Sequence, residues 1–240
     1  MKRLLILAMV ALVAWSCDRD NDDGSYVISK FVMGYYTYDD ITIEVNKDND
    51  ILVHPQIDEI IYEGTADSSV RARFDALAAK YNDTGYSKRK SYLPIEYLEN
   101  QMPVENIQSI ELVCLEEFDA QHPAESLVND CVTFTAYSPL PFLLSNYQRT
   151  NGYDSNLSFK YLSSMYSIYT YSIISKPLSE IAADDMVLIG DGQTYKPMIF
   201  YLSPTAGSLD SFMGKRFCLT LNYENQAPIT TEFTFSPSKI

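Results

Sequence analysis

Alternating hydrophobic and polar positions recur along most of the chain, which is the pattern of β-strands that bury one face. Residues 41–45 (ITIEV) alternate in this way and are followed by a polar turn at 46–50 (NKDND). Apolar runs at 51–53 and 57–62, on either side of a His-Pro pair, predict two further short strands. The chain beyond residue 40 therefore begins as a series of strands joined by polar turns.

Strand patterns continue to the C-terminus. Further strands are expected at 110–114, 132–137, 161–174, 194–202, 217–223 and 229–235. The segment 161–174 is uncharged and is long enough for one long strand or two short ones. The connection 225–228 (NQAP) separates the last two strands, so these two strands are expected to form a hairpin.

One segment has helical periodicity instead. Its apolar residues follow the i, i+4, i+7, i+8, i+11 spacing of a single helix face: Val70, Phe74, Leu77, Ala78 and Tyr81. Asp67, Ser68 or Ser69 can cap the start of this helix, and Gly85 can end it. The spacing predicts one short amphipathic helix over about residues 70–81.

Many short strands and one helix predict a mainly β protein, a β-sandwich-like single domain. The chain of 240 residues is long enough to bury a sizeable core. The alternative of two domains would place the boundary between them at residues 148–158.

The first 16 residues have the pattern of a secretory signal peptide. Lys2 and Arg3 precede the apolar run 4–14, which is shorter than the about 20 residues that span a bilayer. Residues 14–17 (AWSC) resemble the bacterial lipobox, in which the cysteine is lipidated and becomes the first residue of the mature protein. That resemblance implies a lipid anchor on Cys17, whereas the alternative is an ordinary cleaved signal peptide.

The acidic stretch 18–25 (DRDNDDGS) predicts a flexible tether, because it has no apolar side chain to bury. Its position after Cys17 resembles the surface-export signal of Bacteroidota-type lipoproteins, which implies an outer-membrane location exposed at the cell surface. The expected organisation is a signal peptide at 1–16, a tether at 17–25 and a β-rich extracytoplasmic domain at 26–240.

Acidic residues outnumber basic residues by 32 to 18, and the formal net charge is −14. This balance argues against a nucleic-acid backbone as the partner. Cleavage after residue 16 would remove two basic residues and no acidic residue, so the mature chain would carry 16 basic and 32 acidic residues. A soluble acidic surface accounts for this excess, and the alternative is an acidic face for a cationic partner.

The search for catalytic and metal-binding motifs finds none. His54 and His122 each precede a proline, which places them in extended or turn backbone, and neither has a histidine or cysteine at zinc spacing. The G-x-S-x-G, G-x-G-x-x-G and P-loop motifs are absent. We therefore expect no catalytic residue, no metal and no cofactor. Adjacent carboxylates at 116–117 (EE) and 184–185 (DD) leave a carboxylate-pair enzyme as the open alternative.

Three cysteines remain once Cys17 is set aside, and three cannot all pair within one chain. A disulfide between Cys114 and Cys131 would close a loop and contribute about 3 kcal/mol in an oxidising envelope. The alternative is that these two residues and Cys218 are buried free thiols that pack as small hydrophobic groups.

Residues 107–130 carry a further resemblance. An expected strand at 107–112 (IQSIEL) is followed by 118–124 (FDAQHPA) and 126–130 (SLVND). This stretch resembles a family of uncharacterised lipoproteins from Bacteroidota-type gut bacteria, whose motif has a glycine where Glu125 stands here. The resemblance implies an extracytoplasmic β-rich fold at the cell surface and implies no catalytic residue. As a local structure, the stretch is a polar loop with a proline turn.

The function that we expect is a non-enzymatic surface module that binds a glycan, a peptide or a partner protein, or that has a structural role. The 19 tyrosines could form stacking surfaces for a ligand, or they could fill strands and core. The two candidate sets are Tyr35, Tyr36 and Tyr38, and Tyr161, Tyr166, Tyr169 and Tyr171. The alternatives are a carboxylate-pair hydrolase and a subunit of a surface fibre, which would need an exposed edge strand.

Overall fold

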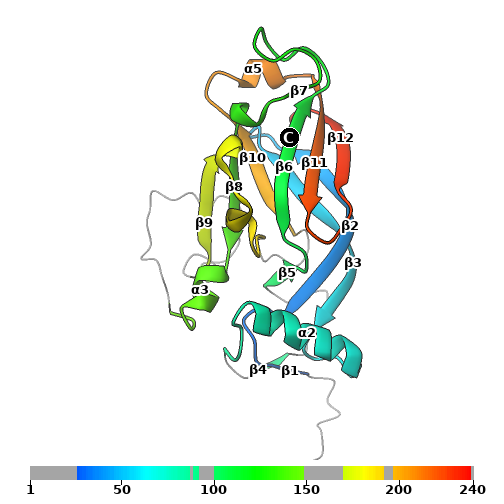
Figure 1. Cartoon of the computed structure of the whole chain (residues 1–240), viewed down its shortest axis with the longest axis vertical. Coiled ribbons are helices and arrows are strands. Elements are labelled where there is room, and N and C mark those ends of the chain that lie inside the picture. The colour runs from blue at the N-terminus through cyan, green and yellow to red at the C-terminus, as the bar shows by residue number, and fades with distance from the viewer. Residues whose placement is uncertain (1–25, 87–88, 92–99, 149–169, 192–196, 239–240) are drawn as a thin grey trace, which may run out of the picture.

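The computed structural model describes residues 26–86, 89–91, 100–148, 170–191 and 197–238 (Figure 1). Strands dominate this part of the chain, and they form a six-stranded sheet, a four-stranded sheet and a two-stranded pair. The two larger sheets share one hydrophobic core. This arrangement confirms the expected mainly β, sandwich-like single domain.

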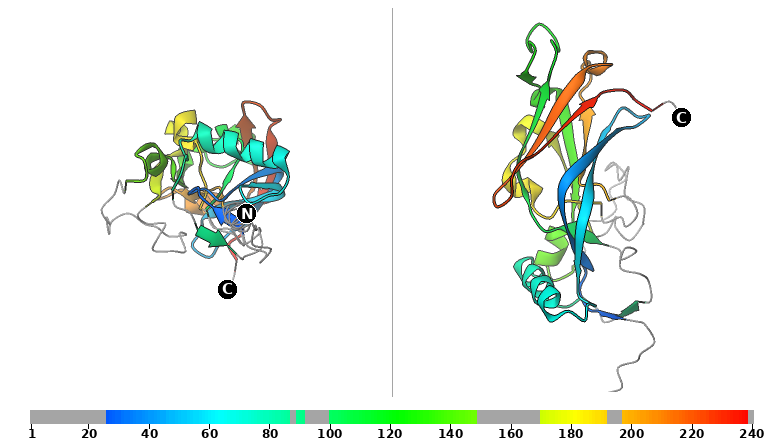
Figure 2. Two further views of the ribbon diagram at one scale, coloured as in Figure 1. Left: turned by 90° about the horizontal axis from the view of Figure 1, so that it is seen from below. Right: turned by 90° about the vertical axis from the view of Figure 1, so that its right-hand side faces the viewer.

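The six-stranded sheet has the strand order β5-β2-β3-β10-β8-β9. Its strands are β5 (Gln101–Pro103), β2 (Gly34–Val45), β3 (Ile51–Tyr62), β10 (Phe200–Pro204), β8 (Val132–Ser138) and β9 (Ser172–Pro177). Only the short β5 runs parallel to its neighbour, β2. The β2–β3 hairpin extends along most of the molecule, as the right-hand view of Figure 2 shows.

The four-stranded sheet has the order β12-β11-β6-β7. Its strands are β12 (Ile229–Thr234), β11 (Arg216–Tyr223), β6 (Ile107–Cys114) and β7 (Ser126–Leu127). The predicted C-terminal hairpin is confirmed, because β11 and β12 pair antiparallel over six residues each. The separate pair consists of β1 (Tyr26–Ile28) and β4 (Arg89–Ser91).

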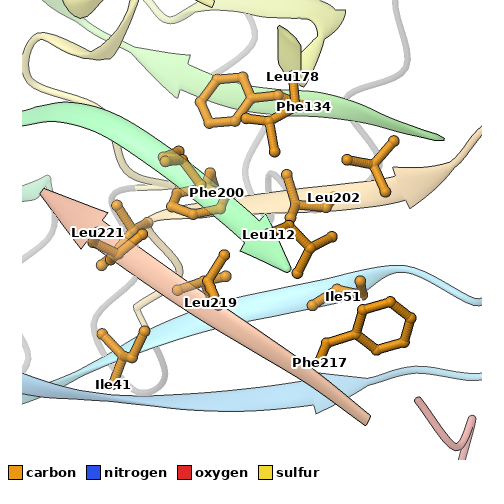
Figure 3. Close-up of a cluster of buried hydrophobic side chains, with 14 of the residues drawn as sticks. Ile41, Ile51, Leu112, Phe134, Leu178, Phe200, Leu202, Phe217, Leu219 and Leu221 are labelled. Atoms are coloured by element: carbon orange, nitrogen blue, oxygen red, sulfur yellow. The ribbon is translucent and has the colours of Figure 1, made fainter. Parts of the chain in front are cut away.

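The core between the two sheets is built from the alternating residues that the sequence pattern indicated. Leu112 on β6 and Leu219 and Leu221 on β11 face Phe200 and Leu202 on β10, and all five side chains are fully buried (Figure 3). Burial of a leucine or phenylalanine side chain contributes about 1.5–3 kcal/mol, so this layer is a main source of stability.

The six-stranded sheet also buries part of its other face. Tyr36 belongs to the core between the sheets, whereas its neighbour Tyr35 belongs to a second core that includes Phe74 of α2 (Ser68–Lys80) and Phe142 of α3 (Leu140–Leu144). Successive residues of a strand point to opposite faces. Several strands of this sheet are therefore apolar on both faces.

The predicted helix is confirmed as α2, the longest helix in the described part of the chain. Asp67 is its N-cap: its Oδ1 accepts hydrogen bonds from the backbone N–H groups of Ser69 (2.8 Å) and Val70 (3.4 Å). The helix ends before the expected Gly85, because the chain turns at Asn82, which has a left-handed φ of 61°. Asparagine tolerates this conformation better than most residues do.

The prediction of two short strands at 51–53 and 57–62 is wrong, because β3 is one strand that runs through His54 and Pro55. Pro55 pairs with Ile41 on β2, while the register between β3 and β10 stops at Val53. A proline is tolerated at a strand position that need not donate an N–H to a second neighbour.

Two other expected strands fall partly outside the described residues. The described end of the 161–174 segment enters β9, which begins at Ser172, and the described end of 194–202 enters β10, which begins at Phe200. Among the described residues, no helix is both long enough and apolar enough to cross a membrane.

Candidate functional site

An open groove of about 320 Å³ lies where β6 and the chain after it face the 3₁₀ turn η3 (Leu178–Glu180). The side of the groove formed by β6 and the chain after it consists of Ser109, Ile110, Glu111, Leu127 and Asn129. The opposite side consists of Leu178, Ser179 and Ile181. Four of these residues are aliphatic and four are polar, and such a mixture is usual in a binding groove.

The groove exists because β6 has only a short partner on its outer edge. The two residues of β7 pair with Val113 and Cys114. Further along the same edge, the side chain of Asn129 takes the place of a strand. Its Oδ1 accepts the N–H of Leu112 (2.9 Å), and its Nδ2 donates to the carbonyl of Ile110 (2.9 Å).

The described lining of the groove is poorly suited to catalysis. Glu111 is its one carboxylate, and no histidine, cysteine, lysine or arginine lines it. Glu111 is therefore the one residue of the described lining that could act as a base toward the hydroxyls of Ser109 and Ser179. The geometry favours a binding surface over a carboxylate pair.

The candidate stacking tyrosines do not form a ligand platform in the described part of the chain. Tyr35, Tyr36, Tyr38 and Tyr171 are at most 4% exposed and lie in the two cores. Tyr161, Tyr166 and Tyr169 lie outside the described residues. The described tyrosines thus serve packing, the alternative use that the sequence left open.

The two acidic pairs have structural partners. Glu116 Oε1 accepts the backbone N–H of Arg216 at 3.2 Å. Asp185 accepts from Lys176 Nζ (2.8 and 2.9 Å) and from the N–H of Ala182 (3.0 Å), and its hydrogen bonds from Lys176 lower its pKa. These contacts attach Glu116 to β11 and Asp185 to β9.

The two histidines have different surroundings. His54 is buried on β3, and its Nδ1 lies 3.0 Å from the carbonyl of Pro197. His122 lies in the loop between β6 and β7, between two carboxylates. Its Nδ1 is 2.9 Å from Asp119 Oδ1, and its Nε2 is 3.3 Å from Asp130 Oδ1.

Cys131 lies beside the second of these carboxylates. Its Sγ is 3.7 Å from Asp130 Oδ1, and one ligand atom each from His122, Asp130 and Cys131 lie within 4.8 Å of one another. The sequence spacing did not predict this cluster, because no second histidine or cysteine lies close to His122 in the sequence. The signal that existed was the Asp-Cys pair at 130–131, which begins eight residues after the histidine and lies just beyond β7.

The described cysteines Cys114, Cys131 and Cys218 are free thiols in this structure, and the first two are buried. The disulfide between Cys114 and Cys131 is therefore not formed here. Burial raises the pKa of Cys131 to about 11, so its thiol is protonated at neutral pH. The lipidation site Cys17 lies outside the described residues.

The motif at 118–130 builds the β6–β7 loop around His122. Phe118 packs against the ring of His122 (5.8 Å between ring centroids) and against Phe212 of α5 (Leu209–Phe212; 4.9 Å). Asp119 Oδ1 accepts the backbone N–H groups of Gln121 (2.8 Å) and His122 (2.9 Å). Glu125 has a left-handed φ of 63°, a conformation that a glycine would adopt without strain.

We compared the chain with known proteins in three ways. No protein-family model, no curated protein and no solved structure matches it.

Proposed function

We propose that this chain is a non-catalytic binding module of the bacterial outer-membrane surface, anchored by a lipid on Cys17, and that its groove beside β6 binds an extended segment of a partner protein. The observation that carries the proposal is the groove itself: it is open, half of its lining residues are aliphatic, and it lies beside β6, which β7 covers only at Val113 and Cys114. An extended peptide lying along such a groove places alternate side chains against its aliphatic lining.

The lining favours a peptide over a sugar. Leu127 and Ile181 present aliphatic surface over the buried Ile110 and Leu178, and no aromatic ring among the described lining residues offers a stacking face for a sugar. Leu127 is 49% exposed, one of three large hydrophobic side chains exposed in the described part of the chain. Such a side chain gains free energy when a partner covers it.

Charge indicates what kind of peptide fits. Glu111 is exposed in the groove, and the whole chain carries a net charge of −14. A segment that alternates aliphatic and basic residues would bury its aliphatic side chains against Leu127 and Leu178 and direct a cation toward Glu111. Complementary charge of this kind accelerates association and selects among partners.

The test uses short synthetic peptides that alternate aliphatic and basic residues, with binding measured by fluorescence anisotropy. Wild-type protein is expected to bind saturably and to leave the peptides uncleaved. The Leu127→Asp variant should bind at least about tenfold more weakly, which corresponds to about 1.4 kcal/mol. The matched control is Leu144→Asp, because Leu144 is 59% exposed and lies on α3, outside the groove.

Three results would contradict the proposal. The first is the absence of binding by wild-type protein, and the second is an equal loss of binding in both leucine variants. The third is peptide cleavage that disappears in Glu111→Gln, which would indicate an enzyme. Self-association that depends on Leu127 would instead support the fibre alternative, with a second copy of the chain as the occupant of the groove.

A further inference from the structure

The strongest cluster of chemically active side chains outside the groove lies where the β6–β7 loop meets the turn η2 (Asn129–Cys131). His122 Nε2, a carboxylate oxygen of Asp130 and Cys131 Sγ converge within 4.8 Å. We propose that His122, Asp130 and Cys131 form a binding site for a zinc ion. The argument for this site does not rest on the proposed binding of a peptide in the groove.

Two of the three distances within the cluster fit zinc. Bond lengths of about 2.0–2.1 Å to nitrogen and oxygen and about 2.3 Å to sulfur, at tetrahedral angles, place ligand nitrogen and oxygen about 3.3 Å apart and ligand sulfur and oxygen about 3.5 Å apart. The structure has 3.3 Å between His122 Nε2 and Asp130 Oδ1 and 3.7 Å between Cys131 Sγ and the same oxygen. The third separation, between the ligand atoms of His122 and Cys131, is at most 4.8 Å, so these two side chains would have to move toward each other by up to about 1.3 Å to bind one zinc ion.

The second nitrogen of His122 has the partner that a zinc-bound histidine usually has. Its Nδ1 lies 2.9 Å from Asp119 Oδ1, and the same oxygen accepts the backbone N–H of His122 at 2.9 Å. A carboxylate in this position orients the imidazole and directs the lone pair of Nε2 toward the metal. Asp119 is thus a positioning residue for the site.

The backbone at the thiol ligand is also fixed. The carbonyl of Cys131 accepts hydrogen bonds from Thr205 N (2.9 Å), Thr205 Oγ1 (3.1 Å) and Ser208 Oγ (3.1 Å). The ring of His122 is held on the other side by Phe118. Two of the three ligands are therefore held in place by contacts that do not involve a metal, which lowers the entropic cost of binding one.

Exposure of the cluster permits entry of an ion. The side chain of Asp130 is 62% exposed and that of His122 is 15% exposed, whereas Cys131 lies beneath them. Three protein ligands leave a fourth tetrahedral position for water or for a group from a partner. The competing arrangement is a protonated His122 between two carboxylates, which needs no ion.

The test is titration of the reduced protein with Co²⁺ and Zn²⁺. One equivalent of Co²⁺ is expected to produce the thiolate-to-cobalt charge-transfer band in the near ultraviolet, and Zn²⁺ should displace it. His122→Gln and Cys131→Ser should abolish the band. The matched control Cys218→Ser should keep it, because Cys218 lies on β11 and does not belong to the cluster.

The positioning role of Asp119 has its own readout. Asp119→Asn should keep the band and weaken zinc affinity about 10–100-fold, the usual effect of losing such a partner.

Absence of the band in wild-type protein, or its loss in Cys218→Ser, would overturn the zinc site. Alkylation of the wild-type protein, mapped by mass spectrometry, keeps the test valid if a variant misfolds. Zinc should slow modification of Cys131 more than that of Cys114, and equal rates would contradict the site.

Discussion

At the scale of single residues, Glu125 has an unfavourable backbone conformation. Its φ is 63°, and its N–H donates to the carbonyl of Cys114 at 2.8 Å, which fixes the turn that starts β7. A non-glycine residue in this region is strained by about 1–3 kcal/mol, whereas glycine adopts it freely. The residue that closes the loop is thus a local source of instability.

We predict that Glu125→Gly stabilises the protein by about 1 kcal/mol, the relief of strain less the extra chain entropy of glycine. Urea denaturation would measure the change. Glu125→Ala is the control, because alanine removes the charge but retains the Cβ atom and its strain. Equal stabilisation by both variants would show that charge, and not φ, is responsible.

Asp83 is a fully buried carboxylate with three donors. It accepts the backbone N–H groups of Phe31 (3.0 Å) and Val32 (2.9 Å) and the hydroxyl of Tyr147 (2.7 Å). These bonds connect the segment before β2 to the end of α2 and the turn after α3. Burial nevertheless raises the pKa of Asp83, because it outweighs the lowering effect of the three donors.

We predict that Asp83→Asn lowers the free energy of unfolding by about 1–3 kcal/mol, because the amide nitrogen cannot accept a donor N–H. A carboxyl group with a raised folded pKa contributes stability that is complete below its unfolded pKa of about 3.9 and is lost as the pH rises through the folded pKa. The deficit of the variant should therefore be largest near pH 3 to 4 and shrink at higher pH. Denaturant unfolding of both proteins at about pH 3 and at higher pH would measure this deficit, and a deficit that grows with pH would contradict a raised pKa of Asp83.

At the scale of elements, α2 is fixed to the sheet mainly by its apolar face. Phe74 is fully buried and packs on Tyr35 of β2, with 5.6 Å between ring centroids. On the exposed face, Arg73 forms a bidentate ion pair with Glu59 of β3, in which Nη1 donates to Oε1 (2.8 Å) and Nη2 donates to Oε2 (3.0 Å). Two neighbouring residues of α2 thus attach it to the sheet in different ways: Phe74 by buried packing and Arg73 by an exposed ion pair.

We predict that Phe74→Ala lowers the free energy of unfolding by about 3–5 kcal/mol, the usual range when a buried phenylalanine is replaced by alanine. Arg73→Ala should cost at most about 1 kcal/mol, because exposed ion pairs contribute little. Circular dichroism recorded during thermal unfolding would compare the stabilities of the two variants. Similar costs for both variants would mean that the ion pair, and not the packing, attaches the helix.

The sequence predicted elements well where only one face is buried. The stripe around Phe74 predicted α2, and the alternation in β11 and β12 predicted their hairpin. It failed at β3, where both faces are buried and the apolar run contains Pro55, so periodicity could not show one continuous strand. Local sequence also could not show that β2 extends back to Gly34, which depends on a second core beneath it.

The functional sites were the least predictable part for the same kind of reason. The groove depends on β7 being too short to cover the edge of β6, which is a matter of pairing across the fold. The His122 cluster depends on the chain after β7 bringing Cys131 back to the histidine in the β6–β7 loop, with Asn129 bonded to β6. Neither the groove nor the His122 cluster therefore shows itself as a motif of residues at fixed spacing in the sequence.

At the scale of the whole molecule, the two proposed sites share one wall. Asn129 lines the groove, and Asp130 and Cys131 follow it in the same 3₁₀ turn, η2 (Asn129–Cys131). An ion bound by the turn would restrain the wall against which a peptide docks. Zinc would then strengthen peptide binding, and the peptide would strengthen zinc binding by the same factor.

The last prediction concerns attachment to the membrane. If Cys17 carries the lipid, Cys17→Ala should leave the membrane fraction or accumulate as an uncleaved precursor, because each buried methylene of the acyl chains contributes about 0.8 kcal/mol to anchoring. Cell fractionation would show the change, and mass spectrometry of the N-terminal peptide of wild-type protein should find the lipid on Cys17. The control Cys218→Ala alters a cysteine of the folded domain and should remain with the membrane. A processed Cys17→Ala protein that still fractionates with outer membrane would show that the chain is held there by something other than this lipid.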